Sequence, residues 1–126
     1  MSIFRDRPLV DAAVTTIGLA LVGSGTYGVL YPLKSAHGFG IVNAKLPETL
    51  FYPGLAGRNL SVGLAVLALT SMRDRKALGT VLLCWMCTGF ADTYICLTEP
   101  DVVNTWIHVM NTGILAVTGS HLVGWW

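Results

Sequence analysis

The chain has 126 residues, of which 53% are hydrophobic and 12% are charged, and its net charge at neutral pH is +1. A typical soluble domain has about twice that share of charged residues, so the composition argues against an ordinary water-soluble fold. The near-neutral charge offers no basic surface for nucleic acid, and we expect no nucleic-acid partner. The apolar composition instead predicts a membrane protein surrounded by lipid.

Four apolar stretches follow one another along the chain, each about the 20 residues that a helix needs to cross a bilayer. They are residues 9–30, 49–71, 77–98 and 103–125. The first is too long and continuous for a cleaved signal peptide, so we expect it to stay as a signal anchor. The sequence therefore predicts an all-α integral membrane protein, a four-transmembrane-helix bundle in which residues 1–126 form a single domain.

The connection at residues 31–47 mixes glycine and proline with apolar residues such as Phe39 and Ile41. A freely solvated loop would be more polar. We expect this segment to fold back over the bundle as a lumenal cap, which is allowed only where protein or cavity water satisfies its backbone.

Glycines inside the first two predicted spans indicate close helix packing, because small residues let helix backbones approach each other in lipid. These glycines are Gly18, Gly23, Gly25, Gly28, Gly54, Gly57 and Gly63. Pro53 lies early in the second span, where it is expected to mark the helix end or to kink the helix.

The cysteines Cys84, Cys87 and Cys96 are an odd number within one apolar span, which is a poor layout for a disulfide framework. We interpret them as small buried apolar residues. The Cys84–Cys87 spacing has no second pair, so we expect no metal site.

Basic residues near the ends of the predicted spans indicate the orientation, because lysine and arginine are retained on the cytoplasmic side. The third connection holds Glu99 and Asp101 without a basic residue, and the first holds only two lysines. The cytoplasmic candidates are Arg5, Arg7, Arg73, Arg75 and Lys76. We expect both termini in the cytoplasm and the protein in the endoplasmic reticulum.

Charged residues inside the predicted spans are candidates for a working site. A charge at the bilayer centre costs on the order of 2.5–3.5 kcal/mol, so those retained usually pair and face the bundle interior. Arg58 lies in the second span and Asp92 in the third. In the predicted orientation both are roughly 10–14 Å deep on the lumenal side, by the helical rise of 1.5 Å per residue.

The fourth span carries a polar stripe that includes His108 at a depth similar to that of Asp92. Its residues follow steps of three and four, which places them on one helical face. The stripe comprises Asn104, Thr105, His108, Asn111 and Thr112. We expect it to point toward Arg58 and Asp92.

An aspartate and a histidine near an arginine can supply a proton donor, a proton acceptor and a fixed positive charge for a developing anion. We therefore take Asp92, His108 and Arg58 as candidate catalytic residues. In the simpler alternative, Arg58 and Asp92 are only an interhelical ion pair and His108 donates to a carbonyl, which fixes helix association. Candidate substrate-binding residues are Asn111, Tyr52, Asn59, Tyr94, Trp85 and Phe39.

These motifs resemble those of small fungal four-helix membrane proteins of unknown function in the DoxX-like group. The resemblance runs through Pro32, Phe39-Gly40, Gly57-Arg58-Asn59-Leu60 with Gly63, Ala91-Asp92 and His108. In that group the Gly-Arg pair, the aspartate and the histidine recur, and Asn59 here replaces an expected acidic residue. Relatives often accompany fungal natural-product pathways, so the resemblance implies a lipophilic small-molecule substrate.

We accordingly expect a cofactor-independent acid/base isomerase or cyclase that acts on a lipophilic small molecule in fungal natural-product biosynthesis. Asp92 and His108 would exchange protons, while Arg58 would orient Asp92 or stabilise an enolate-like anion. Two alternatives are a quinone-linked redox-accessory subunit, like other DoxX relatives, and a scaffold or assembly protein for larger membrane enzymes. The sequence leaves the oligomeric state open, and a homo-oligomer is one of the open alternatives.

Overall fold

The computed structural model describes residues 8–99 and 101–125, and these are mostly helical. The long helices lie at the four predicted apolar stretches: α1 (Pro8–Leu30), α3 (Tyr52–Ser71), α4 (Arg75–Thr98) and α5 (Thr105–Val123). The connection between α1 and α3 contains two short helices, α2 (Pro32–Phe39) and the 3-10 helix η1 (Glu48–Phe51). Pro53 lies in the first turn of α3, where its missing N–H costs no helix hydrogen bond. It therefore marks a helix end.

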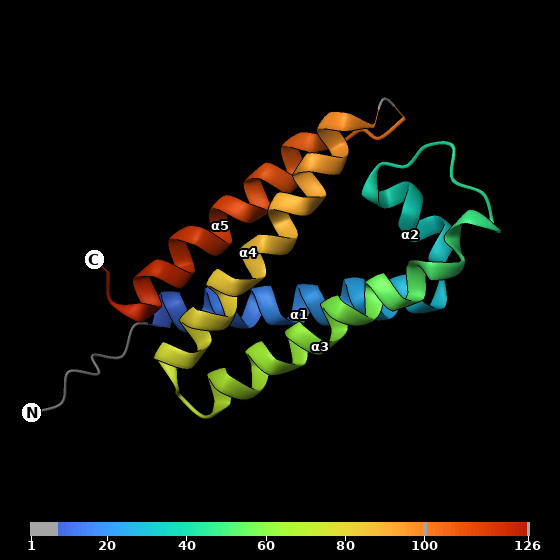
Figure 1. Ribbon diagram of the computed structural model, residues 1–126. Helices are drawn as coiled ribbons and strands as arrows, with labels where there is room; N and C mark the ends of the chain where they lie inside the picture. The colour runs from blue at the N-terminus through green and yellow to red at the C-terminus, as the bar shows by residue number, and fades with distance from the viewer. Residues whose placement is uncertain (1–7, 100, 126) are drawn as a thin grey trace, which may run out of the picture.

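The long helices form two pairs. α1 packs along α3 and α4 packs along α5, whereas contact between the pairs is sparse. Figure 1 shows that the pairs meet at one end, here called the apex, and diverge toward the other, the wide end, where α2 lies between them. We call the pairs the α1–α3 arm and the α4–α5 arm. The apex holds the buried core, formed by Val14, Val66, Leu78, Leu82, Leu115 and Leu122.

Glycines make the close approach within each arm possible. A Cβ at Gly25 of α1 would collide with the backbone of Leu60 in α3, and one at Gly63 would lie 2.7 Å from the amide nitrogen of Val22. The expected packing role also holds for Gly18 and Gly28. It is wrong for Gly23, Gly54 and Gly57, where an added Cβ would meet nothing within 4 Å.

The predicted cap segment folds back over the bundle, and most of its first half is the helix α2. On one side, the Tyr52 hydroxyl at the start of α3 donates to the carbonyl of Ser35 in α2, at 3.2 Å. On the other side, Ile41 forms an isolated antiparallel bridge with Val102, in the α4–α5 connection. The amide of Val103 donates to the Gly40 carbonyl at 3.0 Å. Residues 31–47, here called the α2 segment, thus connect both arms at the wide end.

Two helices of the described chain, α1 and α4, are long and apolar enough to cross a membrane by length and composition. Within that part of the chain α3 and α5 do not meet the same threshold. α3 carries Arg58 and Asn59, and α5 carries His108, Asn111 and His121, all of which lower mean hydropathy. Arg5 and Arg7, used above for orientation, lie outside the described residues.

The cysteine prediction is corrected for two of three positions. Cys96 is buried, whereas Cys84 and Cys87 are exposed on α4, and all three are free thiols. The physical reason is that α4 packs mainly against α5, so the side of α4 that carries Cys84 and Cys87 is not covered by another helix of the described chain. Apolar character therefore did not establish burial here.

Candidate functional site

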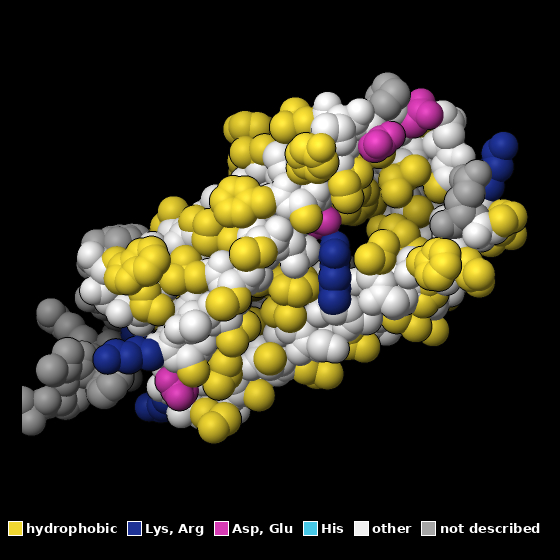
Figure 2. All heavy atoms as spheres, viewed as in Figure 1, with side chains coloured by type: hydrophobic (Ala, Val, Ile, Leu, Met, Phe, Trp, Pro, Cys, Tyr) yellow, Lys and Arg dark blue, Asp and Glu magenta, His cyan; other side chains and the backbone are white. Residues whose placement is uncertain are grey.

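A cavity of about 650 Å³ lies between the two arms and is lined by side chains from α1 to α5 and from η1. Figure 2 shows the hollow between the arms, where basic and acidic side chains meet. Much of the wall is apolar, and it includes Ile17, Leu21, Leu55, Ile95 and Ile114. This volume is within the roughly 300–1,000 Å³ of small-molecule sites, which combine an apolar wall with a few polar groups.

Arg58 and Asp92 form an ion pair across the space between the arms. The Nη2 atom of Arg58 in α3 donates to Oδ1 of Asp92 in α4 at 2.9 Å. The side chains are 36% and 16% exposed, respectively, so the pair is partly desolvated and reachable from the cavity. The Nε atom of Arg58 is buried without a hydrogen-bond partner among the described residues. The contact is therefore one bond rather than the two-bond fork that arginine can form with a carboxylate.

His108 in α5 is held by the last residue of α2. Its Nε2 atom lies 3.2 Å from the carbonyl oxygen of Phe39, and the two rings pack with centroids 4.3 Å apart. Because a carbonyl oxygen only accepts hydrogen bonds, Nε2 must carry the proton in this contact. In a neutral imidazole, Nδ1 is then the unprotonated nitrogen, so His108 has the form of a base at Nδ1.

The geometry agrees in part with each of the two predicted interpretations. The ion pair and the histidine-to-carbonyl bond are the contacts that the simpler, helix-fixing alternative predicts. Arg58, Asp92 and His108 nevertheless all line one cavity, as a catalytic site requires. No hydrogen bond joins Asp92 to His108 within residues 8–99 and 101–125, so any proton exchange between them would pass through a bound molecule.

The structure brings eight of the nine candidate site residues to this cavity, namely Arg58, Asp92, His108, Asn111, Tyr52, Asn59, Trp85 and Phe39. The ninth, Tyr94, is 67% exposed and is not part of the lining. Tyr94 follows Asp92 by two residues, which turns its side chain by about 200° around the helix. Its placement beside the cavity was therefore wrong.

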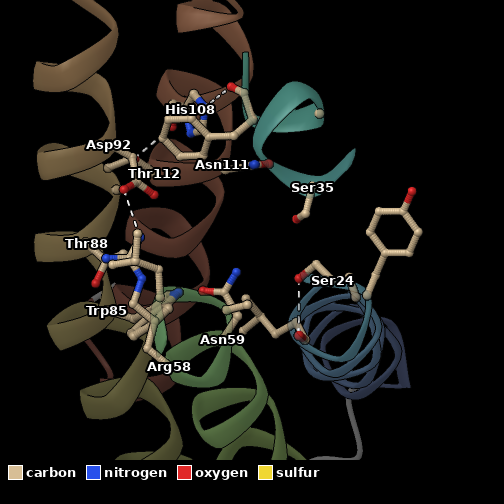
Figure 3. A pocket seen from close by; sticks show the side chains of 18 of the residues that line it. Ser24, Ser35, Arg58, Asn59, Trp85, Thr88, Asp92, His108, Asn111 and Thr112 are labelled. Carbon is tan, nitrogen blue, oxygen red and sulfur yellow. Dashed lines mark hydrogen bonds and ion pairs between the residues drawn. The ribbon is translucent and has the colours of Figure 1, made fainter. Parts of the chain in front are cut away.

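Several polar lining residues were not predicted. Figure 3 shows Thr88, Asp92 and His108 on one side of the cavity and Ser24 and Ser35 on the other. Thr88 precedes Asp92 by four residues, so helical spacing from Asp92 would have found it. Ser24 and Ser35 come from α1 and α2, and their position depends on how the arms pack, which the sequence pattern does not specify.

The polar side chains do not form a recognisable metal centre. Within the described residues, no group of three or more histidine, cysteine, aspartate or glutamate side chains could hold a metal ion. The functional groups that the cavity presents are instead a guanidinium, a carboxylate, an imidazole, amides and hydroxyls.

One family model matches most of this sequence. Residues 18–122 match the domain of unknown function DUF4267, and this range contains every side chain named above as part of the cavity, except Ile17. No curated protein and no solved structure matches the chain. Because the match covers far more than half of the sequence, the chain belongs to the DUF4267 family.

Proposed function

We propose that the chain is a membrane enzyme that isomerises or cyclises a lipophilic small molecule by proton transfer, without a cofactor. The observation that carries this proposal is the convergence of Arg58, Asp92 and His108 on one largely apolar cavity. Proton transfer is redox-neutral, so the reaction class needs only groups that accept and donate protons. The cavity presents two such groups on separate helices.

The proposed roles follow from the contacts of each side chain. His108, with its Nε2 proton held by Phe39, would remove a proton from the substrate through Nδ1. The imidazolium formed in this step would be the source of the proton for another position of the same molecule, and the Asp92 carboxylate, oriented by Arg58, would accept and relay that proton. The positive charge of Arg58 would stabilise negative charge that develops on a substrate oxygen. The surrounding apolar wall would exclude water.

We further propose that all four long helices cross the bilayer, as a four-span bundle in the endoplasmic reticulum with cytoplasmic termini. Exposed apolar side chains on every long helix, such as Leu19, Leu64, Phe90 and Val117, support a lipid surround. At the wide end, Tyr31 lies under the Lys34 ammonium group at 5.6 Å, an aromatic and basic arrangement that is common at membrane interfaces.

This topology is testable by labelling single cysteines in intact microsomes. In a cysteine-free background, Met72→Cys in the α3–α4 connection should react with a membrane-impermeant maleimide. Asn43→Cys, in the connection between α2 and η1, should react only after permeabilisation. Labelling of both before permeabilisation would contradict the four-span topology.

The catalytic proposal is testable by deuterium incorporation. Purified protein in D₂O would be incubated with a panel of lipophilic enolisable ketones, and the exchange of carbon-bound hydrogen measured by mass spectrometry. We expect protein-dependent exchange that falls by about 10²-fold or more in Asp92→Asn and in His108→Ala, the usual contribution of an acid or base group. Arg75→Gln is a control, because Arg75 pairs with Asp11 outside the cavity. Unchanged exchange in both Asp92→Asn and His108→Ala would refute the assignment.

The predicted alternatives would give different results. A quinone-linked accessory subunit, as the DoxX-like resemblance implies, would purify with a redox-active chromophore and would not catalyse exchange. A scaffold protein would show no exchange without partner chains. We favour the enzyme because the ionisable groups face an open cavity of about 650 Å³, whereas helix association alone does not require a cavity.

A further inference from the structure

The charge balance and the openings of the cavity restrict what the cavity can bind. Arg58 and Asp92 neutralise each other through the 2.9 Å contact, and a neutral His108 imidazole with its proton on Nε2 is sufficient to satisfy the Phe39 carbonyl. The ionisable groups of the described lining therefore sum to about zero. A bound carboxylate would add an uncompensated negative charge to a partly desolvated site, which is costly. An uncharged ligand avoids that cost.

Several hydrogen-bond donors in the cavity wall remain available to a ligand. Arg58 uses one nitrogen for Asp92, and its side chain remains 36% exposed, so further guanidinium N–H groups can reach a ligand. Asn59 and Asn111 add amide donors to the same lining. Donors of this kind match a neutral acceptor oxygen such as that of a carbonyl group.

The size of the cavity indicates a substantial apolar body. A buried apolar cavity of about 150 Å³ holds one benzene molecule, and this cavity of about 650 Å³ is roughly four times larger. Apolar side chains from α1, α3, α4 and α5 contribute to the wall, which favours a hydrocarbon skeleton of several rings or a folded chain.

Both ends of the V formed by the arms are obstructed. The apex is filled by the core around Val66 and Leu82, and the wide end is crossed by the α2 segment and its bridge from Ile41 to Val102. Of the two sides of the V, the one where α3 and α4 diverge is open, because Figure 2 shows the hollow reaching the surface there. In a membrane-spanning bundle this side faces lipid.

From these observations we propose that the cavity binds an uncharged, lipophilic carbonyl compound, which enters from the bilayer through the gap between α3 and α4. Arg58 holds the carbonyl oxygen. The proposal rests on the proposed function for the position of the arms in the membrane, but it concerns binding and does not require turnover.

Trp85 lines the cavity and provides a fluorescent reporter inside it. The other tryptophans would be removed as Trp106→Phe, Trp125→Phe and Trp126→Phe, and the protein placed in phosphatidylcholine nanodiscs. Three dibrominated probes of equal chain length, a methyl ketone, a carboxylic acid and an alkane, would then be compared as quenchers of Trp85. We expect saturable quenching by the ketone, half-saturation at about tenfold higher concentration for the acid, and only non-saturating quenching by the alkane.

Substitution of both members of the ion pair tests whether Arg58 holds the ketone oxygen, and it leaves no unpaired charge in the cavity. Arg58→Gln with Asp92→Asn should raise the half-saturating ketone concentration by about tenfold or more, the loss expected for a hydrogen bond to a charged group. The matched control, Arg75→Gln with Asp11→Asn, removes the ion pair outside the cavity and should change it less than about twofold. Equal binding of ketone and acid, or an unchanged value in the Arg58 and Asp92 double variant, would overturn the proposal.

The entry route has its own test. Cysteines at the bridged positions, Ile41→Cys and Val102→Cys, placed in a background that lacks the native cysteines, would lock the wide end when oxidised. We expect the rate of Trp85 quenching by the ketone to stay within about twofold of the reduced protein, because the side opening is untouched. A strong slowing would mean that the ligand enters beneath α2. Saturable ketone binding without deuterium exchange would retain this inference and reject only the enzyme assignment.

Discussion

At the residue scale, the proton on His108 is the feature on which the proposed chemistry depends most. The 3.2 Å contact with the Phe39 carbonyl requires a proton on Nε2, because the carbonyl cannot donate one. We predict that the ring-nitrogen chemical shifts of His108, in a ¹⁵N-histidine-labelled sample assigned with His108→Ala, will show the Nε2–H tautomer. An Nδ1–H tautomer would contradict the proposed role of Nδ1 as the base.

The ion pair between Arg58 and Asp92 leads to a second prediction about single residues. Arg58→Gln leaves the Asp92 carboxylate, only 16% exposed, without its partner. We expect a loss of about 1–3 kcal/mol in the free energy of unfolding, less than for a fully buried pair because Arg58 is partly exposed. The double variant Arg58→Gln with Asp92→Asn should recover most of that loss, as measured by denaturant titration in detergent. If the double variant is less stable than Arg58→Gln, the two side chains do not interact as described.

Arg58, Asp92 and His108 could be placed at one level of the predicted bundle from the sequence, because helical rise determines how far along its helix each residue lies. The sequence did not identify Phe39 as the partner of His108. That contact spans 69 residues and depends on where α2 lies, which no spacing within α5 encodes. Tyr94 was misplaced because the rotation between successive residues of α4 turns it away from the side of the helix that carries Asp92.

At the element scale, α1 and α3 are held close by positions where only glycine fits. Gly25→Ala would push a methyl group into the backbone of Leu60, and we expect it to destabilise the protein by about 1–3 kcal/mol through overpacking. Gly23 lies two residues earlier on the same helix with open space around it. Gly23→Ala should be neutral or stabilising by up to about 1 kcal/mol, since alanine favours helix. Equal effects in thermal unfolding would contradict the packing of these helices.

The contact between the α2 segment and the α4–α5 connection can be tested in the same way. Gly40 ends α2 with φ of 119°, and a Cβ there would collide with the carbonyl of Val103. Gly40→Ala should therefore loosen the contact with the α4–α5 connection and speed hydrogen exchange at the Val103 amide, which donates to Gly40. Gly38→Ala, in the same helix but in open space, should leave that exchange unchanged. Equal exchange at Val103 in both variants would mean that Gly40 does not hold the wide end together.

The sequence indicated that residues 31–47 fold back, yet not that they contain a helix. Two signals for α2 were present, Pro32 at its first turn and Gly40 just after its end, the usual asymmetry of helix boundaries. An eight-residue helix is too short to show a clear periodic pattern, so its stability comes from its contacts with the arms.

At the scale of the whole molecule, the four long helices were predictable because each apolar stretch is separated by charged or turn residues. Their pairing into two diverging arms was not. Hydropathy marks which residues are apolar, but both the exposed and the buried sides of these helices carry apolar side chains. The cavity results from that divergence, so it could not be derived from the pattern that located Arg58, Asp92 and His108.

The most direct test of the account is a crystal structure in a lipidic phase with the dibrominated ketone bound, measured at the bromine absorption edge. We predict anomalous bromine peaks between the arms beside Trp85, with the ketone oxygen at Arg58 and with Asp92 and His108 in contact with the same molecule. Bromine found only on the outer surface, or arms closed together so that Arg58, Asp92 and His108 share no space, would contradict it.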